Sequence, residues 1–226
     1  MNIKKEWEWA THRPLIQLML QEYQPELVVE LGVGINSTPL FLDYPYKELL
    51  CIDNNKEWVE LMQDQYAFEG TASILFHDLG DDTIYMGTKV HEISDEQKVK
   101  NFEYYVALRE QIKERVLYPK LLFVDNYTSL RALAINTLGH LFDIIIYHDC
   151  QYVGISWYNY KFQEYLQKDF NFLLLTSSSS WSGCFIRKTL DYDIEVLRDH
   201  IQPFVAEFCK ENNIETSMRL LEDYYS

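Results

Sequence analysis

Residues 27–39 constrain the fold more than any other stretch of this chain. They begin with Leu-Val-Val-Glu-Leu, an apolar run that is typical of a strand buried on both faces of a sheet. Gly32 and Gly34 then permit a tight turn and let the backbone approach a ligand closely. Ser37 or Thr38 can cap the helix that follows. Such a unit is either an ordinary connection or the kind of turn at which open parallel sheets bind nucleotides.

Short apolar runs alternate with helical patterns along the rest of the chain. This alternation predicts a three-layer α/β/α sandwich whose mostly parallel sheet is covered on both faces. The linker at 177–183 is too short for a parallel crossover, so we expect the last two strands to form an antiparallel pair at a sheet edge. Strands are expected at 27–31, 49–53, 73–78, 121–125, 143–149, 170–176 and 184–188, and helices at 5–23, 38–43, 56–68, 95–117, 130–141, 157–168 and 191–212.

The length of 226 residues is enough for one domain with a full core. No domain-scale linker interrupts the pattern, so residues 1–226 are expected to form a single domain. The longest connection, at about 79–120, is predicted to be a helical insertion, and such connections often serve as lids or substrate elements. Residues from about 189 to 226 are predicted to form a C-terminal helical extension.

The net charge of −15 argues against a large nucleic-acid footprint, because an acidic surface repels phosphate. The charged start of the chain has no signal-peptide core, and no apolar run reaches membrane-spanning length. The four cysteines are scattered without a CxxC pair, as in proteins of reducing compartments. We therefore expect a cytoplasmic protein with no membrane or nucleic-acid partner. A homodimer stays an open alternative.

Acidic residues stand at the ends of the predicted strands. In an open α/β sheet the ligand crevice lies beyond the carboxyl ends of the strands, and a carboxylate there is costly unless it binds something. Asp53 follows Gly32 at the spacing of about 20 residues that suits an acid bonded to ribose hydroxyls. A dinucleotide fingerprint G-x-G-x-x-G would need glycine at position 37, where this chain has serine. The acids are Asp53, Asp78, Asp125 and Asp149, with Glu30 just before the first turn.

The run Val-Glu-Leu-Gly-Val-Gly-Ile-Asn-Ser at 29–37 resembles motif I of the class I S-adenosylmethionine-dependent methyltransferases. Asp53 is similar to their second-strand acid, which holds the ribose, and Asp78 to the third-strand acid that contacts the adenine amine. Asn36 departs from the glycine that many members carry. The resemblance implies a seven-stranded sheet of order 3-2-1-4-5-7-6 with strand 7 antiparallel, and S-adenosyl-L-methionine as the cofactor. The implied cofactor-binding residues are Glu30, Gly32, Gly34, Asn36, Ser37, Asp53, Asn54, Asp78, Leu79 and Asp125.

The ends of the fourth and fifth strands look like those of small-molecule O-methyltransferases, and the candidate catalytic residues there are His148, Asp125 and Tyr127. His148 is a candidate general base, since the ordinary imidazole pKa lies near working pH. The alternative is a strand-end histidine that holds Asp125 or a backbone group. The metal-dependent branch of the family uses acids at the positions of Asp125 and Asp149 and an amide where this chain has Cys150. Hard cations prefer oxygen ligands, so a divalent metal is not favoured.

These patterns predict a methyltransferase that uses S-adenosyl-L-methionine to methylate an oxygen or nitrogen of a small molecule. Two alternatives stay open: the same fold used to transfer another group, and a cofactor-binding or scaffold protein without catalysis. At the start of the first long helix, Thr11 is a candidate cap. His12 and Arg13 are likewise expected to have a capping role rather than to reach the pocket.

Overall fold

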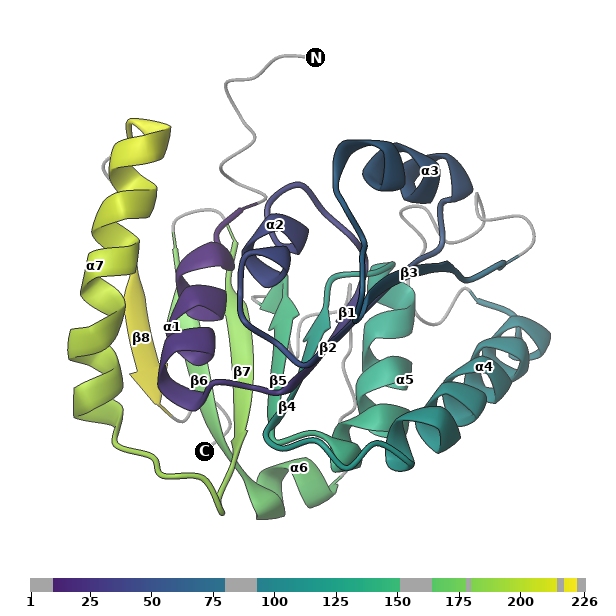
Figure 1. Ribbon diagram of the computed structural model, residues 1–226. Coiled ribbons are helices and arrows are strands. Elements are labelled where there is room, and N and C mark those ends of the chain that lie inside the picture. The colour runs from purple at the N-terminus through teal and green to yellow at the C-terminus, as the bar shows by residue number, and fades with distance from the viewer. Residues whose placement is uncertain (1–9, 80–92, 151–163, 178–179, 215–217, 223–226) are drawn as a thin grey trace.

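The computed structural model describes residues 10–79, 93–150, 164–177, 180–214 and 218–222 (Figure 1). The predicted helices at 5–23 and 157–168 begin outside these residues. No helix in the described ranges is both long and apolar enough to cross a membrane. The helices are α1 (Arg13–Tyr23), α2 (Thr38–Leu42), α3 (Lys56–Gln65), α4 (Asp95–Lys113), α5 (Thr128–Leu138), the 3-10 helix η4 (Gly139–Leu141), α6 (Glu164–Asp169) and α7 (Ile194–Asn212).

The described residues form one sheet of eight strands in the order β3-β2-β1-β4-β5-β7-β6-β8. β1 pairs in parallel with β2 and β4, whereas β7 runs antiparallel between β5 and β6. The predicted strand order and the antiparallel seventh strand are therefore confirmed. The strands are β1 (Leu27–Leu31), β2 (Glu48–Asp53), β3 (Ala72–Phe76), β4 (Lys120–Val124), β5 (Ile144–His148), β6 (Phe170–Thr176), β7 (Ser182–Arg187) and β8 (Arg219–Glu222).

The predicted count of seven strands is too small by one. β8 lies in the segment predicted as a helical extension, where it follows α7 and pairs antiparallel with β6. An unpaired edge on β6 would leave backbone donors and acceptors exposed, and β8 satisfies them. Met218 and Leu220 also place their side chains in the core, where they are 7% and 5% exposed.

Helices cover both faces of the sheet (Figure 1). One face packs against α1, α2, α3 and α7, and the other packs against α4, α5 and α6. The division follows the alternation of side chains along a strand: Val28 of β1 belongs to the first core, whereas Leu27 and Val29 belong to the second. Because both faces are buried, β1 is apolar at nearly every position and reads as a continuous run.

The parallel register brings the predicted site residues to one edge. Leu31, the last residue of β1, lies opposite Ile52 of β2 and Val124 of β4. The residues that come next, including Gly32, Asp53 and Asp125, therefore leave the sheet together at its carboxyl edge. β5 ends at the same edge in His148, because it runs parallel to β4.

Candidate functional site

Glu30 holds together the turn that follows β1. Its side chain is fully buried, and its carboxylate accepts hydrogen bonds of 2.5 Å from the Ser37 hydroxyl and 2.8 Å from the Thr38 hydroxyl. The thiol of Cys51 donates a third bond, of 3.1 Å. Burial raises the pKa of Glu30 to about 7, and the three hydrogen bonds offset this only in part. Ser37 occupies the N-cap position of α2, but its predicted side-chain cap bond is absent, because the hydroxyl is directed at the buried carboxylate of Glu30.

Gly32 is required by the close packing of two strand ends. Its φ is +92°, and a Cβ atom at this position would lie 2.4 Å from the carbonyl carbon of Asp125. No side chain fits into that space. Gly34 and Asn36 are half-buried in the same turn, and the amide of Gly34 donates to the Thr38 hydroxyl at 3.1 Å. The turn is therefore fastened on one side to the end of β4 and on the other to the start of α2.

Asp53 lies beside the same turn and binds it directly. Its Oδ2 atom accepts a 2.8 Å hydrogen bond from the amide of Val33, and its Oδ1 atom accepts one of 2.8 Å from the amide of Asn55. The indole of Trp58 donates to the carbonyl of Val33 at 2.6 Å. A carboxylate accepts about four hydrogen bonds, so Asp53 retains capacity for hydroxyl donors of a ligand.

The residues after β2 and β3 form a separate part of the edge. The amide nitrogen of Asn54 lies 3.0 Å from Nδ1 of His77, whose ring stacks on Tyr104 with centroids 3.4 Å apart. Asp78 is exposed. Leu79 is buried and packs in a small apolar cluster. Of the residues predicted to contact the cofactor here, Asp78 alone has a largely accessible side chain.

Arg131 of α5 joins the ends of β4 and β5. Its side chain is 6% exposed, and its guanidinium lies 2.8 Å from the carboxylate of Asp125 and 3.1 Å from that of Asp149. It also donates to the backbone carbonyls of Asn126, at 2.8 Å, and His148, at 2.7 Å. One buried cation thus holds both predicted strand-end acids in place.

His148 faces the same acids from the end of β5. Its Nδ1 atom lies 3.3 Å from Oδ1 of Asp125, and its Nε2 atom lies 2.9 Å from Ser180 Oγ and 3.2 Å from Thr11 Oγ1. The Ser180 hydroxyl donates to Asp149, so Nε2 of His148 is the donor to Ser180. With Nδ1 directed at a carboxylate, both ring nitrogens are placed to donate hydrogen bonds.

The electrostatics agree with a protonated His148. Burial by itself lowers the pKa of this imidazole, but the nearby carboxylates of Asp125 and Asp149 outweigh the burial and raise it. The pKa of Asp149 falls to about 2, because the charges of His148 and Arg131 outweigh its own desolvation. Of the two roles considered for His148, this arrangement favours a strand-end histidine that holds Asp125, and it disfavours a general base.

His12 reaches this cluster from the start of α1. It is 1% exposed and makes no cap bond, so its predicted capping role is wrong. Its ring lies edge-on to His148 with centroids 4.6 Å apart, and neither of its nitrogens has a hydrogen-bond partner in the described structure. Burial, reinforced by His148, lowers the pKa of His12 to about 3, so the imidazole is neutral. The predicted cap Thr11 bonds His148, and Arg13 pairs with Glu211 at 2.9 Å.

Tyr127 and Cys150 have apolar or buried surroundings near the strand ends. Tyr127 packs against the small apolar group of Leu79, Ile93 and Leu130. The Cys150 thiol is 3% exposed, and burial raises its pKa well above the ordinary value. Hard cations prefer oxygen ligands, so the thiol of Cys150 gives no support to such a site with the two strand-end acids.

Sequence reasoning missed Arg131 and Ser180, and it assigned Thr11 and His12 to a different role. Arg131 left a signal, since it is a charged residue inside the otherwise apolar helical run at 130–135. Ser180 left none, because it is one of four consecutive serines. Thr11 and His12 precede β1 and stand far in the sequence from the residues they contact.

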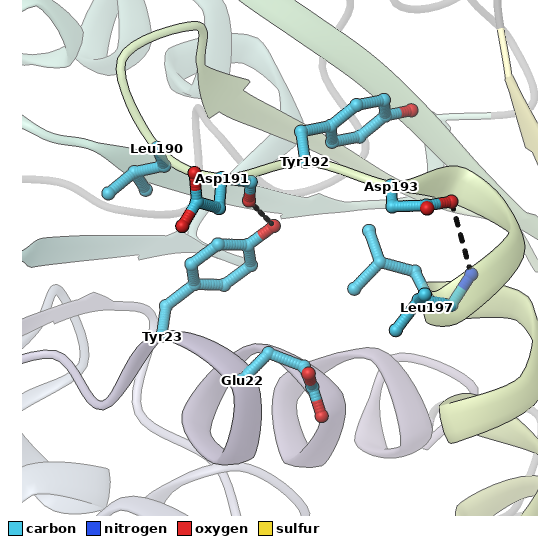
Figure 2. Close-up of a pocket in the computed structure, with 8 residues that line it drawn as sticks. Glu22, Tyr23, Leu190, Asp191, Tyr192, Asp193 and Leu197 are labelled. Carbon is cyan, nitrogen blue, oxygen red and sulfur yellow. Dashed lines mark hydrogen bonds between the residues drawn. The ribbon is translucent and has the colours of Figure 1, made fainter.

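A pocket of about 480 Å³ lies elsewhere, between the C-terminal end of α1 and the segment that leads into α7 (Figure 2). Tyr23 crosses it to donate a 3.0 Å hydrogen bond to the carbonyl of Asp191. Glu22 and Asp193 add carboxylates to its walls. The 1.5 Å rise per helical residue separates Tyr23 from His12 by roughly 16 Å, so this pocket is distinct from the strand-end cluster.

Two solved structures resemble this chain over most of its length. A methyltransferase-like protein from Silicibacter pomeroyi DSS-3 is 15% identical with a TM-score of 0.51, and the match covers 84% of this chain and 93% of that one. Human Methyltransferase-like protein 13, in complex with SAH, is 13% identical with a TM-score of 0.52, and 96% of each chain is covered. The chain therefore has the fold of the class I S-adenosylmethionine-dependent methyltransferases. No protein-family model and no curated protein sequence matches it.

Proposed function

We propose that this protein is an S-adenosyl-L-methionine-dependent methyltransferase that methylates an oxygen or nitrogen of a small molecule. The observation that carries the proposal is the meeting of three features at one sheet edge. These are the turn at 32–34, the carboxylate of Asp53 bonded to that turn, and Asp125 beside the buried His148. A ligand lying across the turn would reach all three.

The residues of the turn suit a cationic nucleoside. Asp53 would accept hydrogen bonds from ribose hydroxyls, while Asp78 would contact the adenine amine. Glu30 would act through the turn, because its carboxylate is fully buried and already bound by two hydroxyls and a thiol. When bound, the cofactor supplies a methyl group on a sulfonium that needs no further activation.

The chain's own contribution to methyl transfer is placement of the acceptor. Both ring nitrogens of His148 face protein partners, Asp125 and Ser180, so His148 would hold these side chains in place rather than take a proton from the acceptor. An amine or an ionised oxygen is nucleophilic without a base, and in-line placement alone supplies much of the rate. The acceptor expected for this site is therefore a nucleophile in its own right.

A small acceptor is favoured by charge. The net charge of −15 repels nucleic acid, and the cluster at the strand ends is compact, with Arg131 and His148 buried. The cluster offers hydrogen-bond donors and acceptors within a few ångströms of each other, from Asp125, Asp149, Arg131 and His148. Such a mixed polar wall suits a molecule with several polar groups.

The first test is cofactor binding, measured by calorimetry and by thermal unfolding with S-adenosyl-L-methionine and its demethylated product. Both ligands are expected to raise the melting temperature, because they bind the folded state. Asp53→Ala is expected to weaken binding by at least about tenfold, since a hydrogen bond to a charged group contributes about 1.5–3 kcal/mol. Asp64→Ala, which removes an exposed acid of α3, is the matched control and should leave affinity unchanged.

No melting shift at millimolar ligand would overturn the cofactor assignment, and equal affinity in the two variants would show that the ribose lies elsewhere. Catalysis is tested separately by release of the demethylated cofactor with a panel of phenols, carboxylic acids and amines. A second candidate function, cofactor binding without catalysis, is favoured by the full engagement of both His148 nitrogens. Tight binding with no turnover across the panel would select it.

A further inference from the structure

Two imidazoles and one carboxylate meet where the start of α1 reaches the ends of β4 and β5. One donor atom from each of His12, Asp125 and His148 lies within 4.8 Å of the other two. We propose that these three residues bind a divalent transition-metal ion of the zinc, cobalt or nickel type. The proposal stands on this cluster alone and does not depend on methyl transfer.

His12 is the observation that points to a ligand. Its side chain is 1% exposed, and both of its ring nitrogens lack a hydrogen-bond partner among the described residues. Burying a polar group without a partner costs free energy, so a chain that does so needs a compensating contact. A neutral imidazole nitrogen is also a common ligand of such ions in proteins.

The spacing of the other two ligands already suits a metal. Nδ1 of His148 and Oδ1 of Asp125 are 3.3 Å apart. Two ligand atoms about 2.1 Å from one ion at a tetrahedral angle are separated by about 3.4 Å. The His12 ring, edge-on to His148 with centroids 4.6 Å apart, is the group expected to move inward when the ion binds.

Charge balance also allows the exchange of a proton for a metal. Asp125 and Asp149 are balanced by Arg131 and by His148 when its Nδ1 atom carries the proton that faces Asp125. A divalent ion bound at Nδ1 would displace that proton and leave one net positive charge. An anionic ligand, such as hydroxide or an ionised oxygen, would then complete the coordination. Arg131 would keep its bonds to Asp149 and the backbone carbonyls.

The ligand types select the class of ion. Imidazole nitrogen suits zinc, nickel, copper and iron, whereas magnesium and calcium require mainly oxygen ligands. This set therefore differs from a hard-cation site built on Asp125, Asp149 and Cys150, where a thiol would stand in place of an oxygen ligand. His12 makes the difference, because it replaces the missing oxygen ligand with a nitrogen.

The test is titration of the metal-free full chain with cobalt(II) alone, followed by visible absorption and calorimetry. One ion per chain is expected, with the d–d bands of a nitrogen and oxygen site and without a thiolate charge-transfer band. Zinc should displace the cobalt, whereas magnesium should not. Nitrogen NMR of the wild-type imidazoles gives a readout that needs no variant, since the His12 and His148 signals should shift on addition of zinc.

His12→Gln and His148→Gln are each expected to weaken cobalt binding by roughly 100-fold, as loss of a directly bound ligand costs at least as much as loss of its supporting partners. His200→Gln is the control, because it removes an exposed histidine that pairs with Glu22 and lies far from the cluster in the fold. Melting temperature and circular dichroism establish that each variant is folded.

Three results would overturn the proposal. The first is the lack of a one-to-one cobalt complex at sub-millimolar metal. The second is equal cobalt affinity in wild type and a folded His12→Gln variant. The third is a zinc-induced NMR change that is confined to His200 or another histidine outside the cluster. If the His12 and His148 variants do not fold, the wild-type NMR experiment decides the question.

Discussion

Gly32, directly after β1, and Asp125, directly after β4, meet backbone against backbone. A Cβ atom on Gly32 would lie 2.4 Å from the carbonyl carbon of Asp125, and the Asp125 amide donates a 2.7 Å hydrogen bond to the carbonyl of Leu31. The turn that is proposed to carry the cofactor and the acid that faces His148 are thus held in one rigid unit. A change at either residue is expected to disturb both.

Gly32→Ala is expected to destabilise the protein by about 3 kcal/mol or more, because strain at positive φ adds to overpacking in the core. Gly70→Ala is the matched control. Gly70 has a φ of +62°, but nothing lies within 4 Å of its added Cβ, so only the backbone cost of about 1–2 kcal/mol applies. Urea unfolding measures both variants. Equal losses would show that contact with Asp125 does not limit the turn.

Glu30→Gln is expected to remove a pH dependence of stability. The folded pKa of Glu30, about 7, lies above its ordinary value of 4.5, so folding favours the protonated acid. Its contribution is fully present below pH 4.5 and is lost as the pH rises toward 7. That loss is on the order of 3 kcal/mol, since each unit of pKa shift corresponds to about 1.4 kcal/mol.

The measurement is the free energy of unfolding of wild type and Glu30→Gln at intervals between pH 5 and pH 8. The stability difference, variant minus wild type, should rise with pH over this window. Gln cannot reproduce all the hydrogen bonds with Ser37 and Thr38, and their loss lowers stability equally at every pH. The change of the unfolding free energy with pH therefore reports only the titration of Glu30. Glu60→Gln, at an exposed position of α3, should follow the wild-type slope. If the free energy of unfolding changes with pH in the same way in wild type and Glu30→Gln, the pH dependence does not come from Glu30.

Arg131→Met is expected to cost about 3 kcal/mol, because breaking a buried ion pair leaves uncompensated charge. The side chains of Asp125 and Asp149 are 24% and 21% exposed, which keeps the expected cost at the lower end of that range. Arg109→Met removes a surface cation that pairs with Glu110 and should cost less than about 1 kcal/mol. Chemical denaturation distinguishes the two. A similar small loss in both would mean that Arg131 does not hold the strand ends.

Most of the fold could be predicted because its signals are local. The apolar runs that become β1 to β7 lie within a few residues of the predicted positions, and the short linker at 177–183 correctly required an antiparallel pair. β8 was missed because its four residues, Arg-Leu-Leu-Glu, are too few to show a strand pattern of their own. Its formation depends on an edge of β6 that exists only after the sheet has assembled.

The site could be predicted only in part. The acids at the strand ends were visible because parallel strands share a carboxyl edge, and the structure brings Asp125 and His148 together as expected. The side-chain caps proposed for Ser37 and His12 are both absent because tertiary packing directs these side chains elsewhere. The Ser37 hydroxyl donates to the carboxylate of Glu30, and the His12 ring packs edge-on against His148.

The sequence by itself determined the alternation of strands and helices, the turn at 32–34 and the row of acids, because these depend on spacing along the chain. Tertiary structure alone decided which charges neutralise each other and which polar groups lose water. Arg131 between two acids, Ser180 on His148 and a neutral His12 beside them all arise from packing between distant segments. Burial sets the protonation states there, and burial is a property of the folded chain.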